Sequence, residues 1–232
     1  MKILIVTPLQ EELDFFLHSC AQRGLRSENS SVGKLPVVRL PELNIALARG
    51  GTGKAQFAVH TRHLLDADGS WELVICAGAA GALANDLAVG DVAVATATIE
   101  HDFNNKFGPS ALPRFDSAPF AVDALRRAPP SGAFGVQFGI VASGDEDVVD
   151  DHRRNMLRED TGAVAVAWEG AGGARACAFS HVPFVEIRGI TDTANSHAPA
   201  DFERNLETAM NNVAVLIQYL SVSGVEASAG AA

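Results

Sequence analysis

The sequence contains little cysteine, and the cysteines it has form no recognisable pattern. Only Cys20, Cys76 and Cys177 occur among its 232 residues. They are widely spaced, lie among apolar residues and include no CxxC pair. This excludes a disulfide framework or a cysteine-ligated metal site as the basis of the fold. It is typical of reduced, buried thiols in the cytoplasm.

Basic residues and long apolar runs are also scarce. Eighteen lysines and arginines stand against 28 acidic residues, which gives a formal net charge of −10. A negative surface repels phosphate backbones and anionic headgroups, so we expect neither a nucleic acid nor a membrane as a partner. The apolar run near the N-terminus ends at Pro8 without a cleavage site, and no segment approaches the length that spans a bilayer. We therefore expect a cytoplasmic protein.

Several common ligand motifs are absent. No GxGxxG follows the first apolar run, and no GxSxG occurs, which argues against a dinucleotide fingerprint and a serine-hydrolase elbow. The pair Gly53-Lys54 does not complete a phosphate loop, because Ala48 and Ala55 occupy positions that require glycine and a hydroxyl residue. The acidic run at 145–151 lacks the glycine and the final glutamate of a calcium loop. We interpret it as a polar loop or a substrate contact, and we expect no metal site.

Short apolar segments alternate with helical patterns along most of the chain. The expected strands are 2–7, 36–40, 43–48, 72–83, 91–99, 134–142, 163–167 and 182–190. The expected helices are 9–17, 55–66, 169–179 and 200–220. This alternation predicts an α/β fold, with helices on both faces of a central mixed, mostly parallel sheet, in a single domain of residues 1–220. Residues 221–232 lack periodicity and bulk, so we expect a disordered tail.

Three carboxylates follow expected strands at widely separated places. Glu12 comes after the first strand, Glu169 after AVAVAW and Asp192 after VEIRGIT. Each has an ordinary explanation when taken alone, as a first-turn charge, a solvated helix start or a helix cap. In a doubly wound sheet, however, strand ends meet at one edge, where ligands bind. Arg188 lies four residues before Asp192 on the last expected strand, close enough to this edge to orient a carboxylate or a water.

Seven segments of the chain resemble the methylthioadenosine/S-adenosylhomocysteine nucleosidases of the nucleoside phosphorylase superfamily, and the similarity runs nearly end to end. The segments are ILIVTPLQEEL (3–13), GGTGKAQFA (50–58), AGAAGAL (77–83), VGDVAVAT with EHDFN (89–96 and 100–104), ASGDEDVV (142–149), AVAVAWEG (163–170) and VPFVEIRGITDTAN (182–195). The resemblance implies a three-layer α/β/α fold and a homodimer whose partner closes the site. It also implies cleavage of the N-glycosidic bond of a 5′-modified purine nucleoside, without a metal or an organic cofactor.

The resemblance assigns a role to each candidate residue. Glu12 is placed as the base that activates water, Asp192 as the acid that protonates purine N7, and Glu169 as the acceptor for the ribose hydroxyls. Arg188 is placed as the assistant of the water site. Such carboxylates suit the reaction, because positive charge develops on the sugar and negative charge on the departing base.

Other positions of the expected pocket depart from the family pattern. Trp168 and Leu9 stand where methionine is usual, and Ala79 where serine is usual. Asp147 replaces a phenylalanine that stacks on adenine. We hypothesise that Asp147 hydrogen-bonds an amino or imino group of the base instead. Val148 occupies the position whose backbone groups contact the base edge in this family.

Three phenylalanines are also expected near the substrate. Phe202 is placed to cover the 5′ substituent. Phe103 and Phe107 are expected to help from the 100–110 loop, across a dimer interface. The departures leave the 5′ group and the base open, so futalosine-type nucleosides are alternative substrates.

The identity of the nucleophile separates hydrolases from phosphorylases within the superfamily. After the first strand the chain has PLQEE (8–12), with no arginine and two acids that repel phosphate, and AGAAGA (77–82) has neither arginine nor serine. These features favour water as the nucleophile. The alternatives are a purine nucleoside phosphorylase, in which Arg39, Arg49 or a partner residue reaches the site, and a nucleoside-binding module without turnover.

Overall fold

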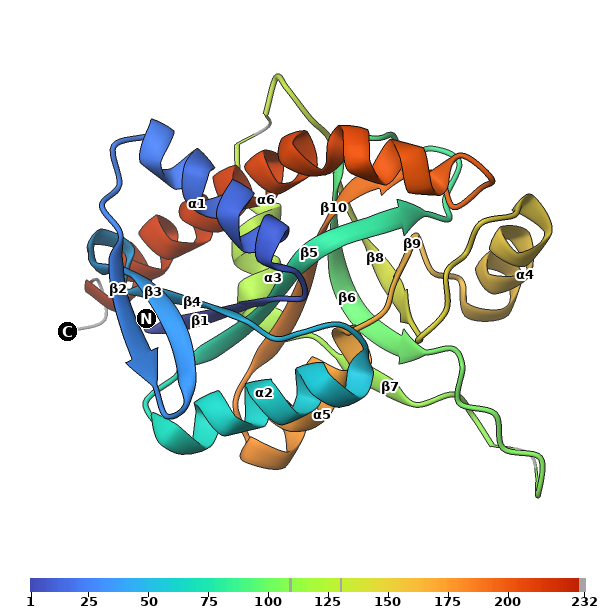
Figure 1. Ribbon diagram of the computed structural model, residues 1–232, viewed down its shortest axis with the longest axis horizontal. Coiled ribbons are helices and arrows are strands. Elements are labelled where there is room, and N and C mark those ends of the chain that lie inside the picture. Colours follow the sequence, from blue (N-terminus) through green and yellow to red (C-terminus); the bar gives the residue numbers. More distant parts are fainter. Residues whose placement is uncertain (109, 130, 230–232) are drawn as a thin grey trace.

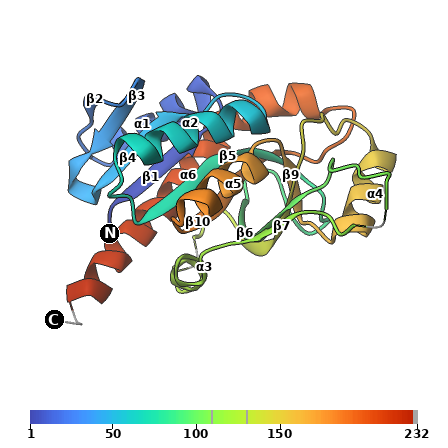
Figure 2. The ribbon, with the colours of Figure 1, turned by 90° about the horizontal axis from the view of Figure 1, so that it is seen from below.

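A mixed sheet runs through the middle of the protein, with helices packed on both faces (Figures 1 and 2). The computed structural model describes residues 1–108, 110–129 and 131–229. The strands are β1 Ile3–Thr7, β2 Glu28–Val32, β3 Leu35–Leu40, β4 Ile45–Arg49, β5 Leu73–Ala82, β6 Val92–Glu100, β7 Arg114–Asp116, β8 Val136–Ser143, β9 Ala165–Ala167 and β10 Phe184–Asp192. The helices are α1 Gln10–Gln22, the 3-10 helix η1 Pro41–Leu43, α2 Lys54–Ala67, α3 Pro119–Arg126, α4 Asp151–Thr161, α5 Gly170–Ser180 and α6 Ala198–Ala229. The expected α/β fold with a central mixed sheet is confirmed.

Strand β5 is the centre of the sheet. It pairs in parallel with β1 on one side and with β10 on the other, and its end also pairs with the short β9. On the far side of β1 lies β4, again in parallel. Strands β4, β1, β5 and β10 therefore run in the same direction and end at one edge, which is the edge where ligands bind in open α/β sheets. Antiparallel pairing is more extensive than the sequence predicts, because β2, β3 and β4 form a meander and β6 runs against β10.

The two faces of the sheet have separate hydrophobic cores. Along β1, Ile3 and Ile5 pack with residues of α1, α3 and α6, whereas Leu4 and Val6 pack with residues of α2 and α5. Neighbouring side chains of a strand point to opposite faces, so a strand buried on both faces is apolar at every position. This explains the uninterrupted apolar run at the N-terminus and the three-layer architecture.

The elements absent from the sequence prediction are either polar or short. Strand β2 is exposed at four of its five positions, and the polar helix α4 buries only Leu157 and Thr161. Strand β7 has three residues and helix α3 has eight, so both are too short to be recognised from a repeating pattern, although α3 buries an apolar face. Helix α6 was expected to end near residue 220 but continues to Ala229. Residues 230–232 of the expected tail lie outside the described residues.

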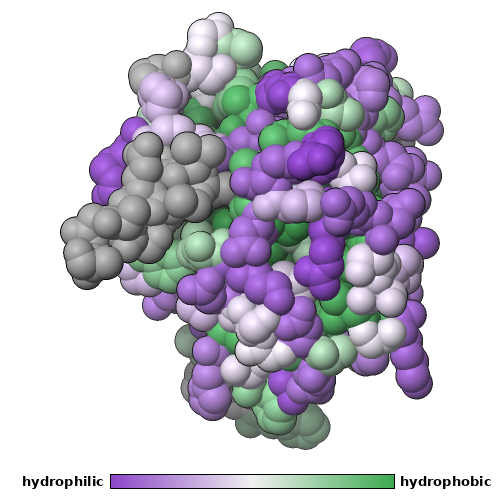
Figure 3. Space-filling view, turned by 90° about the vertical axis from the view of Figure 1, so that its left-hand side faces the viewer, coloured by the Kyte–Doolittle hydropathy of each residue, from purple (hydrophilic) through white to green (hydrophobic). Residues whose placement is uncertain are grey.

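The end of the molecule that carries β2 and β3 is mainly polar, with small and separate apolar areas (Figure 3). Across the residues that the structure describes, no helix is both long and apolar enough to cross a bilayer.

Candidate active site

The parallel pair β5–β10 places the side chains of β10 beside a run of small residues. Arg188 is in register with Gly78, and Asp192 with Gly81. A Cβ added at Gly78 would lie 2.7 Å from Arg188 Nη1 and 2.8 Å from Glu12 Oε1. Glycine is therefore required at this close approach. The small residues of AGAAGA thus leave room for the side chains of Glu12 and Arg188 beside β5.

Glu12 lies in the first turn of α1 and is held by two backbone amides. Its Oε2 accepts a hydrogen bond from Leu9 N–H (2.8 Å), and its Oε1 accepts one from Ala79 N–H (2.8 Å). The side chain is only 2% exposed. Burial raises its pKa from 4.5 to about 7, while the two amides and Arg188 act in the opposite direction. Near neutral pH this carboxyl group can therefore both hold and release a proton.

Glu169 ends the loop after β9 and precedes α5. Its Oε1 accepts a hydrogen bond from Gly53 N–H (3.1 Å), and its Oε2 lies 3.4 Å from Arg188 Nη2. Burial raises the pKa of Glu169, and the charge of Arg188 and the Gly53 amide limit that rise. The carboxylate is thus fixed by contacts from two different elements.

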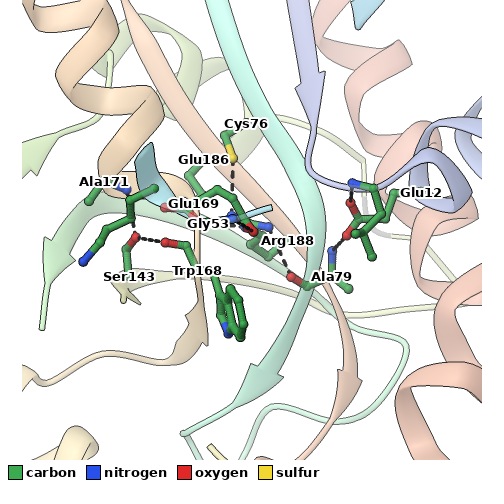
Figure 4. Close-up of polar contacts among 12 residues, drawn as sticks. Glu12, Gly53, Cys76, Ala79, Ser143, Trp168, Glu169, Ala171, Glu186 and Arg188 are labelled. Atoms are coloured by element: carbon green, nitrogen blue, oxygen red, sulfur yellow. Dashed lines mark hydrogen bonds and ion pairs between the residues drawn. The ribbon is translucent and has the colours of Figure 1, made fainter. Parts of the chain in front are cut away.

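Arg188 is fully enclosed among acceptors (Figure 4). Its Nε donates to Glu186 Oε1 (2.8 Å), its Nη1 to the Ala79 carbonyl (3.3 Å) and its Nη2 to Cys76 Sγ (3.3 Å). Glu186 in turn accepts a hydrogen bond from the Thr98 hydroxyl on β6 (2.5 Å). Burial alone would lower the pKa of Arg188, but the surrounding groups have the larger combined effect and raise this pKa above its ordinary value. The guanidinium is therefore a permanent cation. The backbone of Ala79 therefore contacts both Glu12 and Arg188.

Asp192 ends β10 and is held by its own neighbours. Its Oδ1 accepts from Ala194 N–H (2.8 Å), and its Oδ2 accepts from the Thr191 hydroxyl (2.9 Å). Burial raises the pKa of Asp192, whereas these two hydrogen bonds act to lower it. A carboxyl group of raised pKa retains a proton at higher pH than an exposed aspartate, which suits a general acid.

One cavity of about 500 Å³ lies at this edge of the sheet. The sequence-predicted residues in its lining are Leu9, Glu12, Ala79, Asp147, Val148, Trp168, Glu169, Arg188, Asp192 and Phe202. Its volume is in the range of cavities that hold a small molecule. Side chains from the N-terminal, central and C-terminal parts of the chain therefore meet around one nucleoside-sized space.

Phe103 and Phe107 do not belong to this group. Both are exposed, and neither lines the cavity of the single chain. Their contact with the substrate across a dimer interface stays a prediction.

Several residues of the site were not predicted. Thr52, Glu146, Pro199 and Glu203 also line the cavity. Glu186 lies behind it, fully buried beside Arg188. Glu186 could have been predicted as a partner of Arg188, because residues 186 and 188 of a strand point to the same face and both are charged within an apolar run.

Contacts within the protein account for three of the side chains in the acidic run at 145–151. Asp145 accepts a hydrogen bond from Lys54 N–H, Glu146 forms a bidentate pair with Arg153, and Asp150 caps α4 through Arg153 N–H. Asp147 is exposed at the cavity instead. These positions agree with the interpretation of the segment as a polar loop, and a contact of Asp147 with a substrate stays a prediction.

The three-layer α/β fold, with buried carboxylates at the ends of parallel strands, is the arrangement expected of a nucleoside phosphorylase-like protein. Residues 2–221 match the family model described as the phosphorylase superfamily. A match over this length shows that the chain belongs to that superfamily.

Individual relatives narrow the family further. The chain is 31% identical, over 75% of its length and 79% of the relative, to the 5′-methylthioadenosine/S-adenosylhomocysteine nucleosidase of Tolumonas auensis. The nucleosidase of that name from Neisseria meningitidis, solved in complex with methylthio-immucillin-A, superposes with a TM-score of 0.83 at 28% identity, covering 94% of this chain and 97% of the other. The futalosine hydrolase of Helicobacter pylori superposes with a TM-score of 0.83 at 25% identity, covering 95% and 97%. The resemblance to the nucleosidase family is thus confirmed.

Proposed function

We propose that this chain is a purine nucleosidase, in which a single domain of residues 1–220 hydrolyses the N-glycosidic bond of a 5′-modified purine nucleoside. The observation that carries the proposal is the convergence of Glu12, Glu169 and Asp192, all buried, on one cavity. The names of the relatives support the same reaction class.

Asp192 is the proposed general acid. Cleavage of the C1′–N9 bond leaves an electron pair on the purine, and protonation of N7 makes the base a neutral leaving group. Burial raises the pKa of Asp192, which favours the protonated carboxyl group that this role requires. Because Asp192 Oδ1 and Oδ2 are both hydrogen-bonded within the turn, the carboxyl group is also oriented before substrate binds.

Glu12 is the proposed general base, and Glu169 the group that binds ribose. Glu12 has a pKa of about 7, so its carboxylate takes a proton from water readily at neutral pH. Glu169 accepts hydrogen bonds from the 2′- and 3′-hydroxyls, and its charge stabilises the cationic sugar of the transition state. Arg188 contacts Glu169 directly, and its positive charge favours the ionised form of both Glu169 and Glu12.

Water is the proposed nucleophile. Within the described residues, Arg188 is the one basic side chain in the cavity lining, and its guanidinium is already bonded to Glu186 and Glu169. A phosphate dianion would meet the carboxylates of Glu12 and Glu169 without a free cation to bind it. The reaction needs neither a metal nor an organic cofactor.

The substrate carries a purine and a 5′ substituent. Leu9 and Phe202 supply apolar surface for the 5′ group, and Trp168 supplies an aromatic surface beside the sugar. Asp147 accepts a hydrogen bond from an amino or imino group of the base. Methylthioadenosine and S-adenosylhomocysteine are the first candidates. Futalosine is the second, on the likeness to the hydrolase of that name.

A homodimer in the cytoplasm is the proposed setting. Exposed Phe103 and Phe107 are available to a second copy of the chain, which would extend the cavity wall. The three cysteines are buried and unpaired, as expected in a reducing compartment.

The roles of Asp192 and Glu12 are distinguished by a pair of nucleosides. On 5′-methylthioadenosine, Asp192→Asn and Glu12→Gln are each expected to lower kcat about 10²- to 10⁴-fold. A 7-methylpurine riboside carries its positive charge already and leaves without protonation. Asp192→Asn is therefore expected to lose far less on this substrate, while Glu12→Gln loses as much as before. Equal losses of Asp192→Asn on both substrates would exclude Asp192 as the acid.

A further inference from the structure

The start of helix α2 is held by two carboxylates from distant segments. The N-cap residue Gly53 has no side chain that could cap the helix. Instead, the N–H groups of Gly53 and Lys54 donate to Glu169 Oε1 (3.1 Å) and Asp145 Oδ1 (2.9 Å), respectively. Gly53 has a φ of 82°, which favours glycine, and an added Cβ would lie 3.3 Å from Asp145 Oδ1. Negative groups are stabilised at a helix N-terminus, because free N–H groups and the positive end of the dipole meet there. The first turn of α2 therefore ties Glu169 to the loop after β8.

The side chain of Lys54 completes a closed set of contacts. Its Nζ pairs with Asp102 and lies 3.2 Å from Glu100 Oε1, both at or just after the end of β6. Asp102 Oδ2 accepts a hydrogen bond from Asp145 N–H (3.0 Å). Lys54 thus holds Asp145 twice, through its own amide and through Asp102. Glu100 continues the network to Arg175 on α5.

Lys54 itself stays outside the cavity, and so do Asp102 and Asp145. The residues that follow Asp145 form the cavity wall, namely Glu146, Asp147 and Val148. Glu169 forms another part of the lining. The first turn of α2 therefore supports both parts of the lining, because Gly53 N–H holds Glu169 and Lys54 holds Asp145, the residue before the wall segment. Lys54 does this without direct access to a ligand.

We propose that Lys54 is a positioning residue that fixes Glu169 for recognition of the ribose hydroxyls. The role rests on the proposed function, since it acts through Glu169. Loss of the Lys54 ammonium frees Asp102, which holds the Asp145 N–H. The Lys54 N–H then remains as the contact between α2 and Asp145, so the first turn of α2 shifts and moves the Gly53 N–H that holds Glu169. The consequence falls on the discrimination between nucleosides with and without the 3′-hydroxyl, because that hydroxyl is a partner of Glu169.

The test compares kcat/KM for 5′-methylthioadenosine and its 3′-deoxy counterpart in four proteins. These are the wild type, Lys54→Met, Lys54→Arg and the matched control Lys2→Met, which removes a lysine paired with Asp68 far from the cavity. In Lys54→Met the preference for the ribonucleoside is expected to fall about tenfold, mainly through KM. Lys54→Arg is expected to retain most of the preference, and Lys2→Met all of it. The ratio is independent of the folded fraction, so a less stable variant still gives an answer.

Two outcomes overturn the proposal. The first is an unchanged ratio in Lys54→Met with equal losses on both nucleosides, which indicates a merely structural lysine. The second is an equal change of the ratio in Lys2→Met. If the wild type cleaves neither nucleoside, the proposed function fails. Calorimetry then gives the dissociation constants of the two nucleosides, and the ratio of these constants in Lys54→Met and in the wild type decides the role of Lys54. If neither nucleoside binds, the proposed role of Lys54 fails as well.

Discussion

The buried carboxyl group of Glu12 makes the stability of the protein depend on pH in a predictable way. Its pKa rises from 4.5 to about 7 on folding, which corresponds to roughly 3 kcal/mol. Between these two values the folded protein keeps a proton that the unfolded chain has lost. The wild-type free energy of unfolding therefore falls as pH rises through this window. The contribution is fully present below about pH 4.5 and lost above about pH 7.

Glu12→Gln removes this titration. The free energy of unfolding of the wild type minus that of the variant is expected to decline by roughly 3 kcal/mol between pH 4 and pH 8. Urea denaturation at fixed protein concentration, followed by the fluorescence of Trp71 and Trp168, measures the difference. Glu11→Gln, an exposed neighbour in the same helical turn, is the control and should follow the wild type. Parallel curves for wild type and Glu12→Gln, or a difference that grows with pH, would refute a raised pKa at Glu12.

Three further substitutions test separate parts of the site. Gly78→Ala brings a Cβ to 2.7–2.8 Å from Arg188 Nη1 and Glu12 Oε1. We expect kcat/KM to fall at least about tenfold with an unchanged circular dichroism spectrum, and full activity would contradict the close approach. Asp147→Asn should change the ratio of kcat/KM for adenine and hypoxanthine nucleosides by about tenfold, and an unchanged ratio would remove Asp147 from base recognition. Glu186→Gln leaves Arg188 without its nearest carboxylate, so the free energy of unfolding, measured by urea denaturation, should fall by about 3–5 kcal/mol. An unchanged free energy of unfolding would mean that Glu169 alone compensates the buried charge.

The fold was predictable where burial imposes a pattern on the sequence. Residues 3–7 are buried on both faces of the sheet, and their apolar run identifies β1 directly. Strand β2 and helix α4 lie on the surface, and the side chains that would identify them are polar. The sheet direction was harder to predict. The run at 91–99 identifies β6, but its antiparallel pairing with β10 follows from the route of the chain between them.

The acidic residues of the site were predictable because strand ends converge in a parallel sheet. The contacts that fix them were not. Glu12 and Glu169 are held by the backbone N–H groups of Ala79 and Gly53, respectively. Nearly every residue type has a backbone N–H, so the sequence does not show which of them donates. The ion pair of Arg188 with Glu186 could be predicted only from their spacing, which places both side chains on the same face of β10. Sequence patterns and the family resemblance thus located the proposed reacting groups, whereas the fixed orientation of these groups depends on the fold.

The proposed reaction of the three buried carboxylates is the cleavage of a purine nucleoside with water. The most direct measurement follows the products formed from 5′-methylthioadenosine with and without inorganic phosphate. We predict free adenine and a reducing 5-methylthioribose at a rate that phosphate does not change. Formation of the sugar 1-phosphate in proportion to added phosphate, or no release of base in either buffer, would contradict the account.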